Sequence, residues 1–309
     1  MVIGISGGID SAVNAALYRS VLPAENLLLV NTPTRFNSET TKNLARRLAE
    51  NLEAPFVELP IDSFINETVS QIDDLQIPFP SDMKTLHLTG FMKENIQARD
   101  RSTRILATLS SAFGGIFTCN ANKTELTVGY GTLYGDLSGA LAATADLWKH
   151  QIYALGRTLN RYFDKNMIPD EIFTVRPSAE LSENQDITKG LGDPLIYEYH
   201  DFLFRSFIEP WNRITPEEIL TWYSKNCLEE KLGTPVSIKS IFKTHHDFIT
   251  DLEKWWNLFA GFAVAKRIQA PPLLAVSRRP YGYDLRESQI APYYTDTYIH
   301  LKNSLLSNG

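Results

Sequence analysis

Cysteine, positive charge and long apolar runs are all scarce in this sequence. Its two cysteines, Cys119 and Cys227, are too few for a disulfide framework or a four-thiolate zinc site. No stretch approaches the roughly 18 uninterrupted apolar residues that a membrane-spanning helix needs. Lysine and arginine together number 30 against 36 aspartates and glutamates, and the net charge of −6 argues against nucleic-acid binding through bulk charge. We therefore expect a soluble, cytoplasmic protein with no nucleic-acid or membrane partner.

The start of the chain also lacks the layout of a signal peptide. Met1 is followed at once by the apolar run of residues 2–5, with no basic region before it. A chain that opens on a buried strand without a lead-in is unusual. With 309 residues, of which 43% are hydrophobic, the chain is long enough for one large domain or two small ones.

Short apolar runs alternate with helical patterns over the first 165 residues. We expect strands at residues 2–5, 27–30, 56–59 and 115–119, and helices at residues 11–22, 38–52, 93–113 and 147–163. Ser38 is the expected N-cap of the second of these helices. The strands are short and mostly apolar without a regular alternation, which is typical of parallel strands covered on both faces. The sequence therefore predicts an α/β fold, a Rossmann-like parallel sheet with helices on both faces, plus a C-terminal helical extension.

Two later regions have a different character. Residues 73–89 contain Pro78 and Pro80 without a clear period, so we expect a loop there. Beyond residue 194 aromatic residues recur at helical spacing, which predicts a helical subdomain with an aromatic core. A surface that stacks nucleic-acid bases is the alternative, and the acidic charge disfavours it. We divide the chain into a core (1–185), an aromatic-rich helical extension (186–265) and a C-terminal segment that closes on the core (266–309).

The strongest chemical signal is the string Ser-Gly-Gly-Ile-Asp-Ser at residues 6–11, between the first expected strand and helix. Gly7 and Gly8 allow a tight turn and a close approach of the backbone to a ligand. Unpaired N–H groups at the start of the helix favour an anion, and the hydroxyls of Ser6 and Ser11 can add donors. Asp10 suits an anion site only when a cation such as Mg²⁺ bridges it. The string is neither the kinase-type phosphate loop nor a dinucleotide fingerprint, so it predicts a phosphate-binding loop of another kind.

This loop resembles the pyrophosphate loop of the N-type ATP pyrophosphatases, enzymes that split ATP between its α and β phosphates. Further strings resemble NAD synthetase, above all the synthetase part of its glutamine-dependent form. They are KENIQAR at 93–99, NKTE at 122–125, GYGTLYGD at 129–136, DLWKHQIYAL at 146–155, PSAEL at 177–181 and KRIQAP at 266–271. The resemblance runs in order from about residue 4 to residue 180 and resumes near residue 266. It implies a fold like that of the adenine nucleotide alpha hydrolases.

The resemblance assigns roles around ATP. Asp10 and Glu125 match the Mg²⁺-binding carboxylates of the family, and Lys149 matches the lysine that reaches the ATP phosphates; these three are the expected catalytic residues. The expected ATP-binding residues are Ser6, Gly7, Gly8, Asp10, Ser11, Asn120, Lys149 and Ser178. Asn120 departs from the small hydroxyl residue that related enzymes often carry there. Without the resemblance, Glu125 would be an acid at a helix start and Lys149 a solvated lysine.

The resemblance also assigns residues to the second substrate. The expected substrate-binding residues are Phe91, Asn95, Arg99, Asp136, Lys266 and Arg267. Asn95 and Arg99 are four residues apart and share one helix face, which could by itself be a surface face with a salt-bridging arginine. Lys266 and Arg267 match a basic pair on a closing loop, but two cations at a helix C-terminus are an equally good interpretation.

The implied reaction is the ATP-dependent amidation of nicotinic acid adenine dinucleotide. ATP adenylylates the nicotinate carboxylate, and ammonia then displaces AMP, so the products are NAD⁺, AMP and pyrophosphate, with Mg²⁺ as the cofactor and ATP as co-substrate. Neither cysteine has a recognisable glutaminase setting. We therefore expect free ammonia, or ammonia from a glutaminase domain absent from this chain, and we interpret Met1 as the start of a synthetase fragment. We also expect a homo-oligomer.

Two other functions stay open at this point. One is a different ligase with the same loop, either GMP synthetase-like or tRNA-modifying, although the acidic charge weakens the tRNA version. The other is a nucleotide-binding regulatory subunit that has lost catalysis. The presence of both Asp10 and Glu125 argues against the second.

Overall fold

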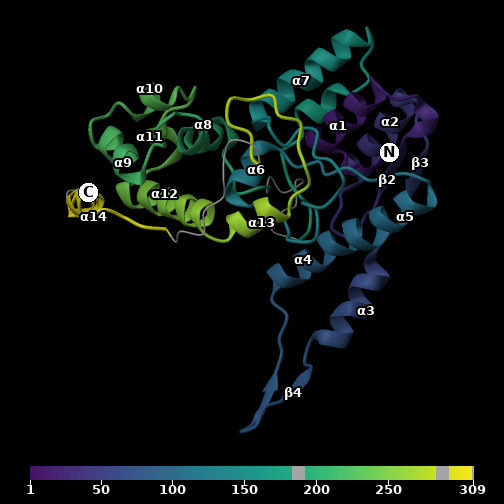
Figure 1. Cartoon of the computed structure of the whole chain (residues 1–309), viewed down its shortest axis with the longest axis horizontal. Coiled ribbons are helices and arrows are strands. Elements are labelled where there is room, and N and C mark those ends of the chain that lie inside the picture. Colours follow the sequence, from purple (N-terminus) through teal and green to yellow (C-terminus); the bar gives the residue numbers. More distant parts are fainter. Residues whose placement is uncertain (183–191, 283–291, 308–309) are drawn as a thin grey trace.

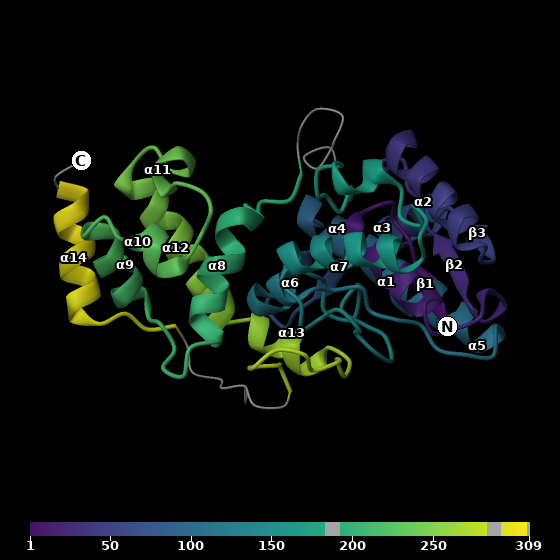
Figure 2. The same cartoon turned by 90° about the horizontal axis from the view of Figure 1, so that it is seen from above.

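The sheet and the aromatic-rich helices occupy opposite ends of an elongated molecule, and the two chain ends lie far apart (Figures 1 and 2). The computed structural model describes residues 1–182, 192–282 and 292–307. Within these ranges no helix combines the length and apolar character that a bilayer crossing requires.

Three parallel strands form the regular part of the sheet, in the order β1 (Val2–Gly4), β2 (Leu28–Asn31) and β3 (Phe56–Glu58). In the register of the sheet, Val2 faces Leu28 and Leu29 faces Phe56. On the other side of β1 the sheet continues only as isolated parallel bridges, which join Val2 to Phe117, residue 118 to 141, and residue 142 to 273. The strand expected at 115–119 is thus reduced to two bridge positions, because the segment pairs with each neighbour at one residue only.

Helices cover both faces of the sheet, as the sequence predicts. Successive residues of a strand point to opposite faces. Ile3 and Leu29 therefore pack into one apolar cluster with α1 (Ile9–Arg19), α2 (Glu39–Leu52) and α7 (Lys149–Tyr162), whereas Val2 and Leu28 pack with Leu106 on the opposite face.

The helix boundaries follow local capping chemistry. The Ser38 side chain accepts a hydrogen bond from the Thr41 N–H and caps α2, as expected. The long helix expected at 93–113 begins one turn earlier, where Thr89 caps α4 (Gly90–Arg99), and it continues through a π-helical segment (Asp100–Leu106) into α5 (Ala107–Ala112). The π-helical segment was not predicted. Short 3₁₀ turns lie at Ala24–Asn26 and Asp170–Phe173.

A narrow arm projects from the body of the molecule (Figure 1). It consists of α3 (Asp62–Ile72) and an antiparallel hairpin of β4 (Gln76–Pro78) and β5 (Met83–Thr85), and it returns to the body through α4. The loop predicted for residues 73–89 is therefore wrong in part. Both faces of the hairpin are largely exposed, so its residues carry no apolar alternation from which strands could be recognised.

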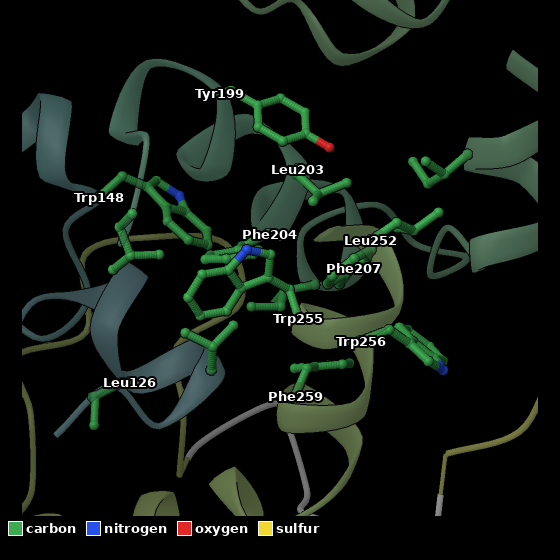
Figure 3. Close-up of a cluster of buried hydrophobic side chains, with 14 of the residues drawn as sticks. Leu126, Trp148, Tyr199, Leu203, Phe204, Phe207, Leu252, Trp255, Trp256 and Phe259 are labelled. Carbon is green, nitrogen blue, oxygen red and sulfur yellow. The ribbon is translucent and has the colours of Figure 1, made fainter. Parts of the chain in front are cut away.

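The region rich in aromatic residues forms a helical core, as the sequence predicts. Its helices are α8 (Tyr197–Ile208), α9 (Pro216–Ser224), α10 (Leu228–Leu232), α11 (Ile238–Ile241) and α12 (His245–Ala260). Figure 3 shows Phe204, Phe207 and Trp255 packed together in this core, with Trp148 and Leu126 reaching it from the sheet half. The same apolar cluster therefore joins both halves of the molecule.

The C-terminal part of the chain contacts both halves. α13 (Ala263–Gln269) packs against α6 (Lys123–Val128), whereas α14 (Asp296–Ser307) packs against α9 and α12. Within the predicted closing segment, 266–309, α14 thus contacts the helical extension rather than the core. The proposed boundary at 185 lies outside the described residues, and the three-part division of the chain stays a prediction.

Candidate functional site

A cavity lies next to the Ser6–Ser11 loop, where β1 ends and α1 begins. Nine of the expected site residues line it: Ser6, Gly8, Asp10, Ser11, Asn120, Glu125, Asp136, Lys149 and Ser178. They come from segments far apart in the sequence and meet at the carboxyl ends of parallel strands, which is where open α/β sheets bind ligands. All the expected ATP-binding residues except Gly7 are therefore gathered in one place.

The loop owes its shape to Gly7. This residue has φ +85°, and a Cβ atom added to it would lie 2.2 Å from the Thr41 carbonyl oxygen of α2. Around it, the Ser11 Oγ donates to the Gly8 carbonyl at 3.0 Å and accepts from the Ser6 N–H at 3.2 Å. The two serine hydroxyls thus hold the turn closed. The first turn of α1, with its unpaired N–H groups, lines the cavity and favours an anion there.

Lys149 and Asp10 form a partly buried ion pair at this loop. The Lys149 Nζ contacts the Asp10 Oδ2, and the Asn122 Nδ2 donates to the Asp10 Oδ1 at 2.9 Å. Burial alone would lower the pKa of Lys149, but the negative charges of Asp10 and Glu125 outweigh burial and hold that pKa above its ordinary value. The side chain is therefore an ammonium ion at neutral pH, and it lines the cavity beside the loop.

Glu125 is held beside this pair by the start of α6. The Asn122 Oδ1 accepts from the Glu125 N–H at 3.0 Å, and the Glu125 Oε2 accepts from the Asn122 N–H at 3.1 Å, which is a capping box. Burial, and next the repulsion from Asp10, raise the pKa of Glu125 well above its usual value. Two carboxylates that repel each other at a phosphate loop fit Mg²⁺, which binds through one or two carboxylates plus substrate phosphates.

Another group of potential metal ligands lies on the arm. In the described residues, Asp73, Asp74 and His87 are the group whose ligand atoms lie close enough together for one ion. Both oxygens of Asp73 already accept hydrogen bonds, from the Leu88 N–H at 2.8 Å and from the Lys93 Nζ at 2.9 Å. We therefore interpret this group as a charged turn, not as a metal site.

Asp193 and Arg101 are among the cavity residues that the sequence reasoning missed. Asp193 accepts hydrogen bonds from the hydroxyls of Tyr130 and Tyr197, at 3.1 and 3.0 Å, and burial raises its pKa. Arg101 donates to the Thr32 carbonyl at 3.2 Å, and burial lowers its pKa to about 10. No local pattern singles out either residue.

Glu180 ties the segment with Ser178 to α2. It is nearly fully buried, and its Oε2 accepts from the Thr41 Oγ1 at 2.7 Å while its Oε1 accepts from the Ser38 N–H at 3.3 Å. The Glu180 N–H in turn donates to the Ser178 Oγ at 3.1 Å. A carboxylate is favourable at a helix N-terminus, so this contact positions the expected ATP-binding serine.

Asp136 is the one expected substrate residue that lines the cavity. It is buried, its Oδ1 accepts from the Thr132 N–H, and burial raises its pKa. The Thr132 Oγ1 donates to the Asn95 Oδ1 at 2.7 Å, and the Arg99 Nε donates to the Leu133 carbonyl at 3.2 Å. Asn95 and Arg99 thus hold the turn at 131–135 beside the cavity rather than lining it.

The remaining expected substrate residues lie outside the cavity. The Phe91 side chain is 68% exposed at the base of the arm. Lys266 and Arg267 lie on α13, a helix, and not on a loop as the resemblance implied. The Lys266 Nζ donates to the Gly129 carbonyl at 2.6 Å, and the buried Arg267 donates to carbonyls of Thr127 and Phe259. In this conformation both cations stabilise the packing of α13 on α6.

Cys119 lies next to Asp136, but its thiol is buried. It is 1% exposed, its Sγ donates to the Asp136 carbonyl at 3.3 Å, and burial raises the pKa of its thiol to about 12. A thiol in this state is a poor nucleophile at neutral pH.

Comparison with known proteins gives the family. Residues 1–240 match the sequence model of NAD synthase. The chain belongs to the NAD synthase family. It is 34% identical to a glutamine-dependent NAD(+) synthetase of Thermotoga maritima over 71% of this chain and 36% of that protein, and 31% identical to one of Xanthomonas campestris over 92% and 45%. It is 33% identical to an NH(3)-dependent NAD(+) synthetase of Helicobacter hepaticus over 75% of this chain and 79% of the relative.

Solved structures agree on the fold. A glutamine-dependent NAD(+) synthetase from Cytophaga hutchinsonii covers 98% of this chain and 52% of its own, with a TM-score of 0.67 at 18% identity. The resemblance to NAD synthetase and the α/β fold class are thereby confirmed. The chain spans 36% to 52% of the length of the glutamine-dependent relatives named above.

Proposed function

We propose that this chain catalyses the ATP-dependent amidation of nicotinic acid adenine dinucleotide with ammonia, to give NAD⁺, AMP and pyrophosphate. The observation that carries the proposal is the meeting of Lys149, Asp10 and Glu125 beside the Ser6–Ser11 loop in one cavity. Membership of the NAD synthase family supports the same reaction.

The chemistry explains why such a site is needed. In the first step a nicotinate carboxylate oxygen attacks the α-phosphorus of ATP, and the bond to the β-phosphate oxygen breaks to release pyrophosphate. In the second step ammonia attacks the activated carbonyl carbon and loses a proton, and AMP leaves with the electron pair of the broken C–O bond. Both leaving groups are anionic, so the site must stabilise developing negative charge.

The residues of this chain can supply that stabilisation. The N–H groups at the start of α1 would bind a phosphate oxygen, and the buried ammonium of Lys149 would neutralise the charge that builds up on the pyrophosphate. Asp10 and Glu125 would hold Mg²⁺, whose chemistry is to neutralise phosphate charge. Asn120 and Ser178 would contact the rest of ATP from the cavity wall.

The dinucleotide would bind beside the turn at 131–135. Asp136 lines the cavity, and Asn95 and Arg99 hold this turn next to it. We propose that Phe91, Lys266 and Arg267 also bind the dinucleotide, as the resemblance implies. This role requires α13 and the base of the arm to change their contacts when the substrate binds. Ammonia would come from solution or from a glutaminase domain absent from this chain.

We also propose a homo-oligomer in which a second copy covers the arm. A two-stranded hairpin is only marginally stable alone in water, yet this one carries exposed apolar side chains. They are Leu75, Phe79 and Met83 on the hairpin, and Phe91 and Met92 on α4. Exposed apolar patches of this kind mark interfaces. Cys119 and Cys227 are both free thiols, which fits the cytoplasmic location that we propose.

The test is a product analysis. The purified chain is incubated with nicotinic acid adenine dinucleotide, Mg-ATP and ammonium, and NAD⁺, AMP and pyrophosphate are measured over time. Formation of the three products in equal amounts supports the proposal, and Lys149→Met should abolish all three together. ADP and phosphate as products, or an inactive wild type, would contradict it.

A further inference from the structure

Helices α6 and α7, whose first turns carry Glu125 and Lys149, both contact α8 of the helical part. The N-cap residue of α7 is Trp148, and its side chain makes no capping hydrogen bond. The first N–H groups of α7 therefore need acceptors from elsewhere. The Thr124 Oγ1 accepts from the Lys149 N–H at 3.2 Å, and the Asp201 Oδ2 accepts from the His150 N–H at 2.9 Å.

The carboxylate of Asp201 is linked to both of these N–H groups, to that of His150 directly and to that of Lys149 through Thr124. It is fully buried on α8, and its Oδ1 accepts from the same Thr124 hydroxyl that receives the Lys149 N–H. Its Oδ2 also lies 2.8 Å from the His150 Nδ1. One carboxylate thus links the start of α6 to the start of α7, and its charge suits the positive ends of both helices.

We infer that Asp201 is a positioning residue for the two reactive side chains of the cavity. Thr124 directly precedes Glu125, and His150 directly follows Lys149, so the residues that Asp201 holds are the chain neighbours of the ones that act. Asp201 itself does not line the cavity. A displacement of about 1 Å in a reacting group can lower a rate by roughly a hundredfold. The helical part therefore contributes to catalysis through this contact.

Three substitutions test the contact from both sides. Both carboxylate oxygens of Asp201 accept hydrogen bonds, but asparagine offers only one acceptor oxygen and replaces the other with an N–H₂ group. In Asp201→Asn, either the Thr124 hydroxyl or the His150 N–H therefore loses its acceptor. Thr124→Val keeps the shape of the side chain but removes the hydroxyl, and Thr124→Ser restores the hydroxyl. If Asp201→Asn does not fold, the two variants at Thr124 still decide.

The matched control is Asp251→Asn. Asp251 is another largely buried carboxylate that pairs with a histidine, since its Oδ2 lies 3.0 Å from the His200 Nε2 and its Oδ1 accepts from the Trp255 Nε1 at 2.9 Å. These partners belong to the helical part and not to α6 or α7. Loss of stability alone should therefore affect both aspartate variants, whereas loss of positioning should affect only Asp201→Asn.

The kinetic comparison rests on the proposed function. We expect kcat for NAD⁺ formation to fall at least about tenfold in Asp201→Asn and in Thr124→Val, with KM for ATP changing less than about threefold. Thr124→Ser and Asp251→Asn should keep kcat within about threefold of the wild type. A kcat for Asp201→Asn that falls no further than that of Asp251→Asn would overturn the inference.

Amide hydrogen exchange in the substrate-free protein gives a readout that needs no activity. Exchange in peptides that cover the starts of α6 and α7 should become at least about tenfold faster in Asp201→Asn and Thr124→Val than in Asp251→Asn. Unchanged exchange in both variants would overturn the inference even if activity falls. If the wild type forms no NAD⁺, the proposed function fails, and the exchange data alone decide the role of Asp201.

Discussion

Replacement of Gly7 by alanine should distort the phosphate loop in a way that the structure allows to be quantified. The residue has φ +85°, where an L-amino acid is strained, and the new Cβ would lie 2.2 Å from the Thr41 carbonyl oxygen and 2.9 Å from its carbonyl carbon. Both atoms belong to the backbone of α2, so neither can rotate away. Because Cβ contacts essentially never fall below 3.0 Å, the loop and α2 must separate by at least 0.8 Å.

The expected cost has two parts. The left-handed conformation costs alanine about 1–2 kcal/mol relative to glycine. Forcing an extra methyl group into a packed site typically costs about 1–3 kcal/mol more. Gly7→Ala should therefore lower the free energy of unfolding by about 2–5 kcal/mol. It should also weaken Mg-ATP binding, because the loop moves.

Gly114→Ala serves as a control that separates the conformational cost from the cost of the steric contact. Gly114 also has a positive φ, +75°, but a Cβ atom there would meet nothing within 4 Å. This variant should lose only the conformational part, about 1–2 kcal/mol. Urea unfolding of both variants, followed by circular dichroism, measures the difference, and calorimetric titration with Mg-ATP measures the loop. If Gly7→Ala loses no more stability than Gly114→Ala, the close contact with Thr41 is not a real constraint on the loop.

Three further predictions follow from the site and the arm. Asp10→Asn should lower turnover more than tenfold without unfolding the protein, as judged by steady-state kinetics beside circular dichroism, and unchanged kinetics would refute a metal role. Because the pKa of Glu125 is raised in the folded state, its ionisation destabilises the ligand-free fold as pH rises through that pKa. Glu125→Gln should therefore have a higher melting temperature than the wild type at pH 8 but not at pH 4.5. The same variant should lose activity. Equal stability gains at both pH values would contradict this assignment. Replacing Phe79 and Met83 together by aspartate should reduce the mass measured by light scattering to that of a monomer with little change in melting temperature, and an unaltered mass would exclude the arm as the interface.

Local sequence chemistry was sufficient for much of the α/β half. Ser38 caps α2 as predicted, because capping depends on a side chain and the N–H groups two or three residues away. The strands β1 and β2 were recognised because parallel strands buried on both faces need continuous apolar runs, whereas β3 is only partly buried and was recognised from its shorter apolar run. The arm escaped recognition for the opposite reason, since its exposed strands bury too little apolar surface to leave a pattern.

The candidate site residues could also be chosen largely from the sequence. The Ser6–Ser11 loop, with its glycines and Asp10, is a local device whose parts all lie within six residues, and nine of the expected site residues line one cavity. Contacts between distant segments were beyond the reach of any local pattern. Examples are Asp193 beside Lys149, and Asp201 between Thr124 and His150.

What the amino-acid sequence determined by itself was therefore the local chemistry: strands, caps, the glycine turn at residues 6–11 and the candidate residues whose types suit ATP and a metal ion. The tertiary structure alone decided which distant groups share one low-dielectric space. Burial and mutual charge shift the pKa values of Glu125 and Lys149, and both effects depend on neighbours more than 20 residues away in the chain. The same holds for Lys266 and Arg267, for which the sequence left two roles open: a substrate-binding pair and two cations at a helix C-terminus. In the fold, Lys266 donates to the carbonyl of Gly129, which ends α6, and Arg267 donates to carbonyls of α6 and α12.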